Sequence, residues 1–286
     1  MLEFKVLSKK TINVNIKPGE SLLIINKKKK LSPSSKITFA GDNIIDIAKE
    51  HVKRVDNSFM SLIKVYLTSL NPIRTIGKQC TETVSNYTGL SLIESEDKLK
   101  EILNNLSCPE TDSLIKKFPF KLEAYEKQRL MFALAFLIKP KLIILDDTIF
   151  KMEPKIKSYI LKELEKLRKE NKTSLIFISK KLDIVNEGID IIAIMYKGTV
   201  IELAKKDLIL TDPIHPYTKH LLNHESTLDF TEQQPEIINY VKNINSTPKN
   251  GCSFCLNCKK ASYDCVYMPP KIKTIGKERQ VICNGA

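Results

Sequence analysis

The chain has 286 residues, of which 42% are hydrophobic and 28% are charged, and its formal net charge is +13. These values are ordinary for a soluble globular protein with one large core, or one core and a smaller module. The sequence predicts no membrane-spanning helix, because no apolar run approaches the roughly 18 residues that such a helix needs. The opening MLEFKVLSKK is too polar for a secretory signal. We therefore expect a cytoplasmic protein.

The positive charge raises the question of an anionic partner. Most of the lysines are scattered in pairs, and the one true cluster, Lys27–Lys30, has no aromatic residue interleaved with it. Modules that bind nucleic acid combine basic residues with a reading element. We therefore expect solvated surface lysines and no nucleic acid, although attraction to an anionic membrane surface is compatible with the charge.

The N-terminal part of the chain is typical of β-strands, because short apolar segments alternate with turn residues. These segments are FKVLS, TINVNI, SLLIIN, KITFAG and SLIKVYL. The third of them opens directly into Lys27–Lys30. A strand that leads into a lysine-bearing loop is where many proteins hold a phosphate.

The pattern then becomes helical over residues 94–139 and is followed by KLIILDD (141–147), a buried strand that ends in two carboxylates. Residues 158–171 predict a helix with Ile160, Leu161, Leu164 and Leu167 facing inward. Two more strands, within 174–179 and 189–198, complete an alternation of strand and helix. This order predicts an α/β fold around a parallel sheet.

The chain turns polar after about residue 225, where we place a boundary. Five of the seven cysteines lie in the last 35 residues, whereas Cys80 and Cys108 stand alone. In a reducing compartment such crowding indicates a metal or cluster site rather than disulfides.

Several motifs together give the chain a resemblance that covers nearly all of its length. It resembles the ATPase subunits of oligopeptide and dipeptide ABC importers. The motifs that carry the resemblance are TSLNPIRTIG (68–77), KQRLMFALAFLIKPKLIILDD (127–147), MYKGTVIE (195–202), HPYTKHLL (215–222), GCSFCLNCKKASYDCVYMPP (251–270) and RQVIC (279–283).

The resemblance implies an ABC-type nucleotide-binding domain over residues 1–225, with a mixed sheet that has a parallel core and antiparallel strands. It also implies a helical subdomain at about 78–138 and a cysteine-bearing C-terminal extension over 226–286. Such a subunit is peripheral to the cytoplasmic face of the membrane, where it pairs with a second ATP-binding subunit and docks on permease subunits. The docking groove corresponds to Ser69, Leu70, Asn71 and Pro72.

The phosphate-binding loop that the family requires is altered here. Such a loop needs glycines, so that backbone N–H groups approach the phosphates, together with a lysine, a Ser or Thr for magnesium, and a following helix. Between Ile25 and Ile37 there is no glycine, and the stretch is too short for both loop and helix. We therefore expect no tight binding of ATP and magnesium.

The other nucleotide-contacting positions of the family are also replaced. Lys64 stands where the family has the glutamine near magnesium, and Lys180 stands where it has the switch histidine. The signature LSGGQ aligns with Leu122–Glu126, which places acidic and bulky side chains at a helix N-terminus meant for a phosphate. Asp146 retains the Walker B carboxylate, while Asp147 replaces the catalytic glutamate with a shorter side chain. We therefore interpret Asp146, Asp147, Lys64 and Lys180 as vestigial.

The C-terminal cysteines match the positions of the family's four cysteines. These are Cys252, Cys258, Cys265 and Cys283, and Cys255 is an additional candidate ligand. Thiolates at such spacing suit a [4Fe–4S] cluster or zinc, and free thiols are the third alternative. The HPYT stretch is expected to be structural, with His215 and Tyr217 packing the tail onto the body.

The favoured hypothesis is a catalytically defective ATPase-like subunit of a peptide importer. One alternative is a regulatory or redox-responsive iron–sulfur protein derived from the same fold. Another is an ATPase that remains active through an atypical loop in which Lys27–Lys30 replace the missing lysine. The neighbouring genes would discriminate the first hypothesis from the second, and a nucleotide-binding titration would test the third.

Overall fold

The computed structural model describes residues 2–6, 12, 14–26, 35–39, 42–43, 60–61, 70–146, 149, 151–180, 182, 188–223 and 251–285. Residue contacts divide the chain into two compact units. Unit 1 consists of residues 1–16, 21–45 and 178–286, and unit 2 consists of residues 17–20 and 46–177. The domain boundary expected near residue 225 falls outside the described residues and stays a prediction.

Unit 1 contains a small antiparallel sheet built from N-terminal segments. Its strands are β1 (Leu2–Val6), β2 (Val14–Ile16), β4 (Ser35–Phe39) and β5 (Asp42–Asn43), in the order β2–β1–β4–β5. Phe4 pairs with Val14 on one side and with Ile37 on the other. The expected antiparallel strands at the start of the chain are therefore present.

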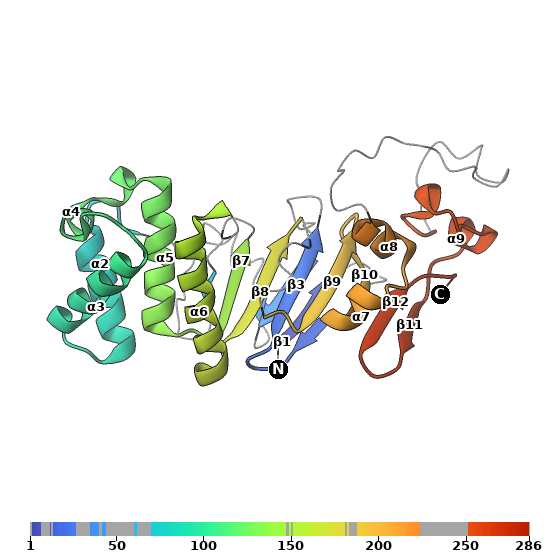
Figure 1. Cartoon of the computed structure of the whole chain (residues 1–286), viewed down its shortest axis with the longest axis horizontal. Helices are drawn as coiled ribbons and strands as arrows, with labels where there is room; N and C mark the ends of the chain where they lie inside the picture. The colour runs from blue at the N-terminus through green and yellow to red at the C-terminus, as the bar shows by residue number, and fades with distance from the viewer. Residues whose placement is uncertain are drawn as a thin grey trace. The chain divides into compact units, whose positions relative to one another are not determined.

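A second sheet in unit 1 joins strands that are far apart in sequence (Figure 1). They are β3 (Ser21–Asn26), β9 (Ile191–Tyr196), β10 (Thr199–Lys205), β11 (Ile272–Ile275) and β12 (Arg279–Ile282). β3 is parallel to β9, whereas the β9–β10, β10–β12 and β11–β12 pairs are antiparallel. All six residues of β3 are buried, which explains its continuous apolar sequence.

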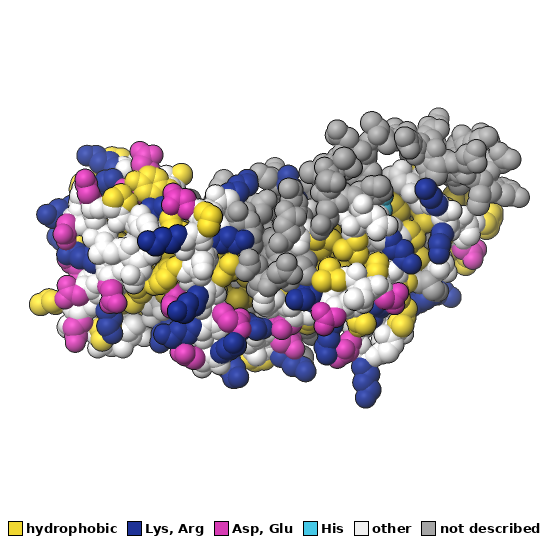
Figure 2. Space-filling view, viewed as in Figure 1, with side chains coloured by type: hydrophobic (Ala, Val, Ile, Leu, Met, Phe, Trp, Pro, Cys, Tyr) yellow, Lys and Arg dark blue, Asp and Glu magenta, His cyan; other side chains and the backbone are white. Residues whose placement is uncertain are grey.

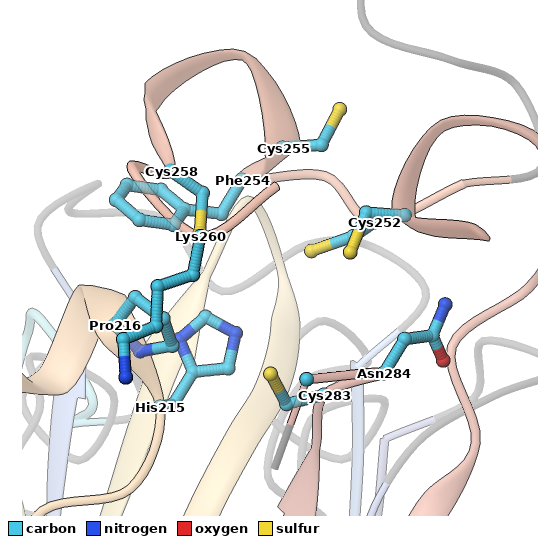
Figure 3. Close-up of a pocket in the computed structure, with 11 residues that line it drawn as sticks. His215, Pro216, Cys252, Phe254, Cys255, Cys258, Lys260, Cys283 and Asn284 are labelled. Atoms are coloured by element: carbon cyan, nitrogen blue, oxygen red, sulfur yellow. The ribbon is translucent and has the colours of Figure 1, made fainter. Parts of the chain in front are cut away.

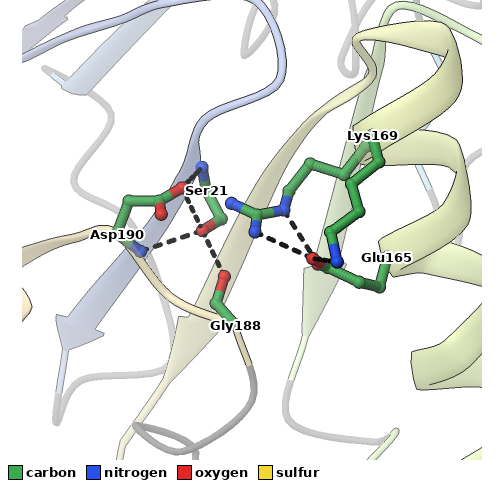
Figure 4. A network of polar contacts seen from close by, with 6 residues as sticks. Ser21, Glu165, Lys169, Gly188 and Asp190 are labelled. Atoms are coloured by element: carbon green, nitrogen blue, oxygen red, sulfur yellow. Dashed lines mark hydrogen bonds and ion pairs between the residues drawn. The ribbon is translucent and has the colours of Figure 1, made fainter.

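A polar network fixes the beginning of β3 (Figure 4). The backbone N–H of Ser21 donates to Asp190 Oδ2 at 2.8 Å, and the N–H of Asp190 donates to Ser21 Oγ at 2.9 Å. The hydroxyl of Ser21 also donates to the carbonyl of Gly188 at 2.6 Å. These bonds hold the start of β3 beside the segment that enters β9.

The β9–β10 hairpin is tight and contains a bulge. Its turn has positive φ angles at Lys197 (46°) and Gly198 (84°), the combination of a type I′ turn, which matches the twist of the flanking strands. Val200 pairs with Met195, but Glu202 pairs with Ile194, so Ile201 is an extra residue in β10. The bulge places Val200 and Glu202 on opposite faces of the hairpin.

Short helices complete unit 1. They are α7 (Lys206–Thr211), α8 (Pro216–Asn223), the 3₁₀ turn η4 (Cys255–Asn257) and α9 (Tyr263–Tyr267). α7 packs on β9 and β10. α8 begins at Pro216, whose fixed φ and missing N–H suit the first position of a helix.

Unit 2 contains a run of consecutive helices. They are α2 (Ile76–Thr88), α3 (Leu92–Asn105), α4 (Thr111–Lys116), the 3₁₀ turn η2 (Pro119–Lys121) and α5 (Ala124–Ile138). α3 starts with a capping box in which Ser91 and Glu94 exchange hydrogen bonds. α5 is apolar on most of its surface, and it contacts α2, α3 and α6.

The remainder of unit 2 alternates strand and helix. It comprises β6 (Met60–Ser61), β7 (Leu142–Asp146), α6 (Pro154–Asn171) and β8 (Ser174–Ser179), whose first four residues belong to this unit. β6 is parallel to β7, as the α/β pattern predicts. In α6 the buried stripe includes Ile156, because the helix starts earlier than the sequence pattern indicated. Leu161, which was expected to face inward, is half-buried beside this stripe. None of the helices in the described ranges is long and apolar enough to span a bilayer.

Candidate functional site

The structure describes only some of the residues predicted on the nucleotide side. Asp146 ends β7, and Lys180 lies half-buried directly after β8. Lys64, Asp147 and the lysine cluster 27–30 lie outside the described residues. Only two of the predicted positions are therefore described, and the vestigial character of all of them stays a prediction.

The N-terminus of α5, which aligns with the family signature, is closed by a carboxylate of the helix itself. Glu126 Oε2 accepts a hydrogen bond from the backbone N–H of Glu123 at 2.8 Å. Its other oxygen, Oε1, lies 2.7 Å from Lys117 Nζ, and the Glu126 side chain is only 4% exposed. The hydrogen bond to Glu126 raises the pKa of Lys117. An amide at the start of α5 is thus satisfied within the chain.

The exposed part of this helix start is aromatic. Tyr125 is exposed, and the guanidinium of Arg129 lies 5.1 Å from the centre of its ring. Arg129 also donates to the carbonyl of Ser107. In the alignment predicted from the sequence, this ring stands at a glycine of the family signature, where a missing side chain would leave the backbone accessible.

The loop before α2 contains the residues expected to contact a permease. Leu70 is half-buried, Asn71 and Pro72 are exposed, and Ser69 lies outside the described residues. Gln79 of α2 supports the loop, because its Oε1 accepts from Asn71 N at 2.7 Å and its Nε2 donates to Asn71 O at 3.0 Å. Ile73 is 81% exposed at the tip of this braced loop.

The five C-terminal cysteines line one pocket in unit 1 (Figure 3). The pocket is formed by the segment around η4, by α9, by the residues after β12 and by the start of α8. The cysteines that line it are Cys252, Cys255, Cys258, Cys265 and Cys283, and His215 lines it as well. In Figure 3 the thiol of Cys255 is turned away from that of Cys283.

Close backbone packing holds the cysteine segment together. The N–H of Cys252 donates to the carbonyl of Cys265 at 2.7 Å. A Cβ atom on the preceding Gly251 would lie 2.3 Å from the carbonyl oxygen of Val266 and 2.5 Å from that of Cys265. Only glycine permits this approach, so Gly251 fixes the position of the first ligand candidate.

Burial disfavours thiolates in the pocket. It raises the pKa of Cys252 to about 12 and also raises the pKa values of Cys258 and Cys283, and the neighbouring thiols reinforce the effect. All seven cysteines are free thiols. Within the described ranges, no three His, Cys, Asp or Glu side chains form a group that could hold a metal ion. The protein alone therefore favours neutral thiols in this pocket.

An aromatic cluster anchors the cysteine segment to the body of unit 1. The ring of Phe254 lies 5.2 Å from Tyr196 of β9, 5.3 Å from Tyr217 of α8 and 5.9 Å from His215. These contacts confirm that the HPYT stretch packs the tail onto the body. The cluster joins three motifs that are distant in sequence.

A buried carboxylate fixes the HPYT turn from the neighbouring strand. Glu202 is fully buried, and its two oxygens accept hydrogen bonds from the N–H groups of Ile214 at 2.9 Å and His215 at 3.0 Å. His215 in turn accepts from the N–H of Tyr217 through Nδ1 at 3.0 Å. The sequence analysis missed this clamp. The sequence feature that could have indicated it is Glu202, the last residue of the MYKGTVIE motif.

His215 is the buried polar side chain of the pocket. It is 1% exposed, burial lowers its pKa to about 4, and its Nε2 has no hydrogen-bond partner among the described residues. The sequence analysis treated His215 as a packing residue only. Its place on the pocket wall becomes visible only when the tail is folded against α8.

Comparisons with known proteins agree with this arrangement. Residues 201–265 match the family model described as the C-terminal region of oligopeptide/dipeptide transporters. This match begins in β10, includes Glu202 and the HPYT turn, and ends at Cys265. The family model thus matches the part of unit 1 in which Glu202, the HPYT turn and the first cysteines pack together.

Longer similarities extend over most of the chain. It is 30% identical over 237 residues to the oligopeptide transport ATP-binding protein AppD of Bacillus subtilis, covering 82% of this chain and 71% of that protein. It is 30% identical over 241 residues to OppD of the same organism, covering 83% and 67%. The fold resembles a solved ATP-binding subunit of an ABC transporter, with a TM-score of 0.54, 20% identity, and coverage of 73% of this chain and 91% of that one.

Proposed function

Because this chain belongs to the family of ATP-binding subunits of oligopeptide and dipeptide ABC transporters, we propose that it is a peptide-importer subunit that does not hydrolyse ATP by itself. It docks on permease subunits at the cytoplasmic face of the membrane and pairs with a second ATP-binding subunit. The defect in hydrolysis distinguishes it from relatives that are named as ATP-binding proteins.

The observation that carries the proposal is the closed N-terminus of α5. In the family resemblance, this helix start is offered to a phosphate held by the partner subunit. Here the carboxylate of Glu126 caps it and is paired with Lys117. A second carboxylate, on Glu123, and the exposed ring of Tyr125 stand at the same place. Negative charge and bulk at a helix start oppose the approach of a triphosphate.

The sequence of the phosphate-binding segment supports the same conclusion. No glycine occurs between Ile25 and Ile37, so no bare backbone is available to surround phosphates. The family's catalytic glutamate is replaced by Asp147, and its switch histidine is replaced by Lys180. The basic and acidic side chains are mixed over the face seen in Figure 2, which favours a protein partner over nucleic acid.

The docking role is supported by the braced loop before α2. Gln79 fixes the loop backbone on both sides of Asn71, which leaves the apolar side chain of Ile73 projecting from a rigid support. An isolated exposed isoleucine on a preorganised loop suits insertion into a hydrophobic recess of a partner protein. We assign the contact with the permease to this loop, including Ser69–Pro72.

We also propose that the cysteine pocket holds a [4Fe–4S] cluster. The donor set suits this cofactor, because four cysteines from three segments line one pocket and a cluster disperses the charge of several thiolates. Cys252, Cys258, Cys265 and Cys283 are the ligands; Cys265 and Cys283 are buried, and Cys252 and Cys258 are half-buried. The cluster supplies one-electron chemistry when bound, while the protein residues position its ligands. Zinc bound by the same cysteines is the alternative, and iron and zinc analysis of the anaerobically purified chain separates the two.

The test of the transport role is co-purification with the permease and a second ATPase subunit from the native host. We expect all components in one complex, and Ile73→Asp should weaken the association by at least tenfold. The matched control is Ile93→Asp, which alters a side chain of similar exposure (77%) on α3. Recovery of the wild-type chain as a free monomer would contradict the docking proposal.

A nucleotide titration tests the catalytic defect separately. The isolated chain should show no tight, magnesium-dependent binding of ATP. Tight binding would instead support the alternative ATPase that uses Lys27–Lys30. An iron–sulfur protein that never joins a transporter would support the redox-responsive alternative, for which the cysteine pocket is the favouring observation.

A further inference from the structure

The imidazole of His215 faces the cysteine pocket with one nitrogen unused. Its ring lies among the pocket-lining residues, on the side of Cys283 (Figure 3). Nδ1 is occupied, because it accepts the N–H of Tyr217 at 3.0 Å. Nε2 is buried and has no partner within the described part of the chain. A buried polar atom without a partner is costly, so its retention calls for a ligand.

The hydrogen bond to Nδ1 assigns the tautomer. A nitrogen that accepts an N–H carries no proton, so a neutral His215 carries its proton on Nε2. Nε2 in this state is a donor without a free lone pair. It therefore cannot ligate a metal, although it can donate to a sulfur atom.

The surroundings hold the ring in this orientation. Both oxygens of Glu202 are engaged with the amides of Ile214 and His215, which fixes the backbone of the turn. Phe254 packs against the ring at 5.9 Å. Asn284, another polar residue of the pocket, is already engaged, since its Nδ2 donates to Asp264 O at 3.1 Å. The imidazole is consequently a preorganised donor.

We propose that His215 is a hydrogen-bond donor to a sulfur atom of the metal-loaded cysteine pocket and thereby sets its reduction potential. This inference rests on the proposed [4Fe–4S] cofactor. An N–H donor stabilises negative charge on sulfur, and the reduced cluster carries one more negative charge than the oxidised cluster. Donation from His215 therefore favours the reduced state and makes the potential less negative.

Two substitutions separate the donor role from the packing role. His215→Asn keeps an acceptor for the N–H of Tyr217, because an Asn side chain bonds the backbone two residues later, but it withdraws the donor from the pocket. His215→Gln keeps a donor near the position of Nε2 and loses the acceptor at Nδ1. The full chain is purified anaerobically for each variant, and iron content, visible spectrum, reduction potential and thermal unfolding are measured.

We expect His215→Asn to shift the potential to a more negative value with near-wild-type unfolding, and His215→Gln to keep the wild-type potential with a lower unfolding temperature. If iron is bound and His215→Asn leaves the potential unchanged, the donor role is overturned and the cofactor stands. A wild-type chain without iron or colour overturns the cofactor and, with it, this inference.

A second readout, independent of the potential, is the ¹⁵N spectrum of the histidine-labelled, iron-loaded chain. The chain has only four histidines, and His215→Gln assigns the relevant signal. A proton on Nε2 that exchanges slowly with water supports the donor role. A proton on Nδ1, or rapid exchange at Nε2, overturns it.

Discussion

The N-termini of α5 and α8 are both stabilised by a glutamate, but the two contacts have different roles. In each case a buried glutamate accepts hydrogen bonds from backbone amides near a helix N-terminus. At α5 the carboxylate of Glu126 belongs to the helix that it caps, whereas at α8 the carboxylate of Glu202 comes from the neighbouring strand β10. The first contact closes a helix end locally, and the second joins two elements of the tertiary structure.

The difference explains which family motifs the chain has kept. A chain of contacts runs from Glu202 through His215 to Tyr217, which packs against Phe254 of the cysteine segment. We expect a change in any member of this chain to loosen the cysteine segment. Under the proposed function no phosphate is bound at the start of α5, which then needs only a local partner, and Glu126 with Lys117 supplies it. On that proposal, motifs that hold the fold together are retained, and those that serve only nucleotide are free to change.

The largest expected effect comes from removing the clamp at α8. Glu202→Ala leaves two buried N–H groups without acceptors, and we expect a loss of about 3 kcal/mol in the free energy of unfolding. Glu202→Gln, which keeps one carbonyl oxygen, should lose about half as much. Urea denaturation measures both values. Equal stability of Glu202→Ala and wild type would show that the clamp does not hold the turn.

Gly251→Ala tests the other support of the cysteine segment. The added Cβ would overlap the carbonyl oxygens of Cys265 and Val266, so we expect a loss of about 2 kcal/mol and weaker metal retention. Lys259→Ala is the control, because this side chain of the same segment is exposed. The same two variants are compared by urea denaturation and iron analysis, and identical behaviour would refute the packing argument.

At α5 the expected effect is smaller. Glu126→Ala removes one cap hydrogen bond and the partner of Lys117, and we expect a loss of about 1.5 kcal/mol. Thermal denaturation compares it with Glu170→Ala, an exposed change in α6 that should be nearly neutral. A cost equal to that of Glu202→Ala would remove the distinction between the local cap and the tertiary clamp.

The smallest effect is expected at Gly77 in α2. A Cβ there would lie 2.9 Å from the carbonyl oxygen of Ile115 and 3.1 Å from its Cβ, so Gly77→Ala should destabilise by about 1 kcal/mol after its gain in helix propensity. Asn86→Ala, at an exposed position of the same helix, should instead stabilise slightly. Stabilisation by Gly77→Ala in urea denaturation would show that α2 and α4 can separate freely.

Much of the fold could be predicted from the sequence. Continuous apolar runs located β3, β7, β8 and β9, because buried parallel strands have both faces covered. The helical period located α6, although its start at Pro154 was missed. The β11–β12 hairpin was not predicted, since β11 is largely exposed and carries little apolar signal.

The candidate site was predictable only in part. The grouping of cysteines followed from their number and spacing, and the structure places all five on one pocket. The clamp by Glu202 and the orientation of His215 could not be predicted, because they depend on a strand and a turn that meet only after folding. A buried glutamate is also improbable from composition alone, as charged residues are seldom buried without specific partners.

The extra residue in β10 has a consequence for how this chain tolerates change. Val200 and Glu202 lie on opposite faces, as neighbours in a regular strand would, so deletion of Ile201 would remove the bulge and leave Glu202 paired with Ile194. Deletion of both Val200 and Ile201 would instead pair Glu202 with Met195 and turn the carboxylate away from the turn before α8, although every amino acid of the clamp was still present. The strand therefore has one residue to spare between Gly198 and Glu202, and loss of a second one would release the turn.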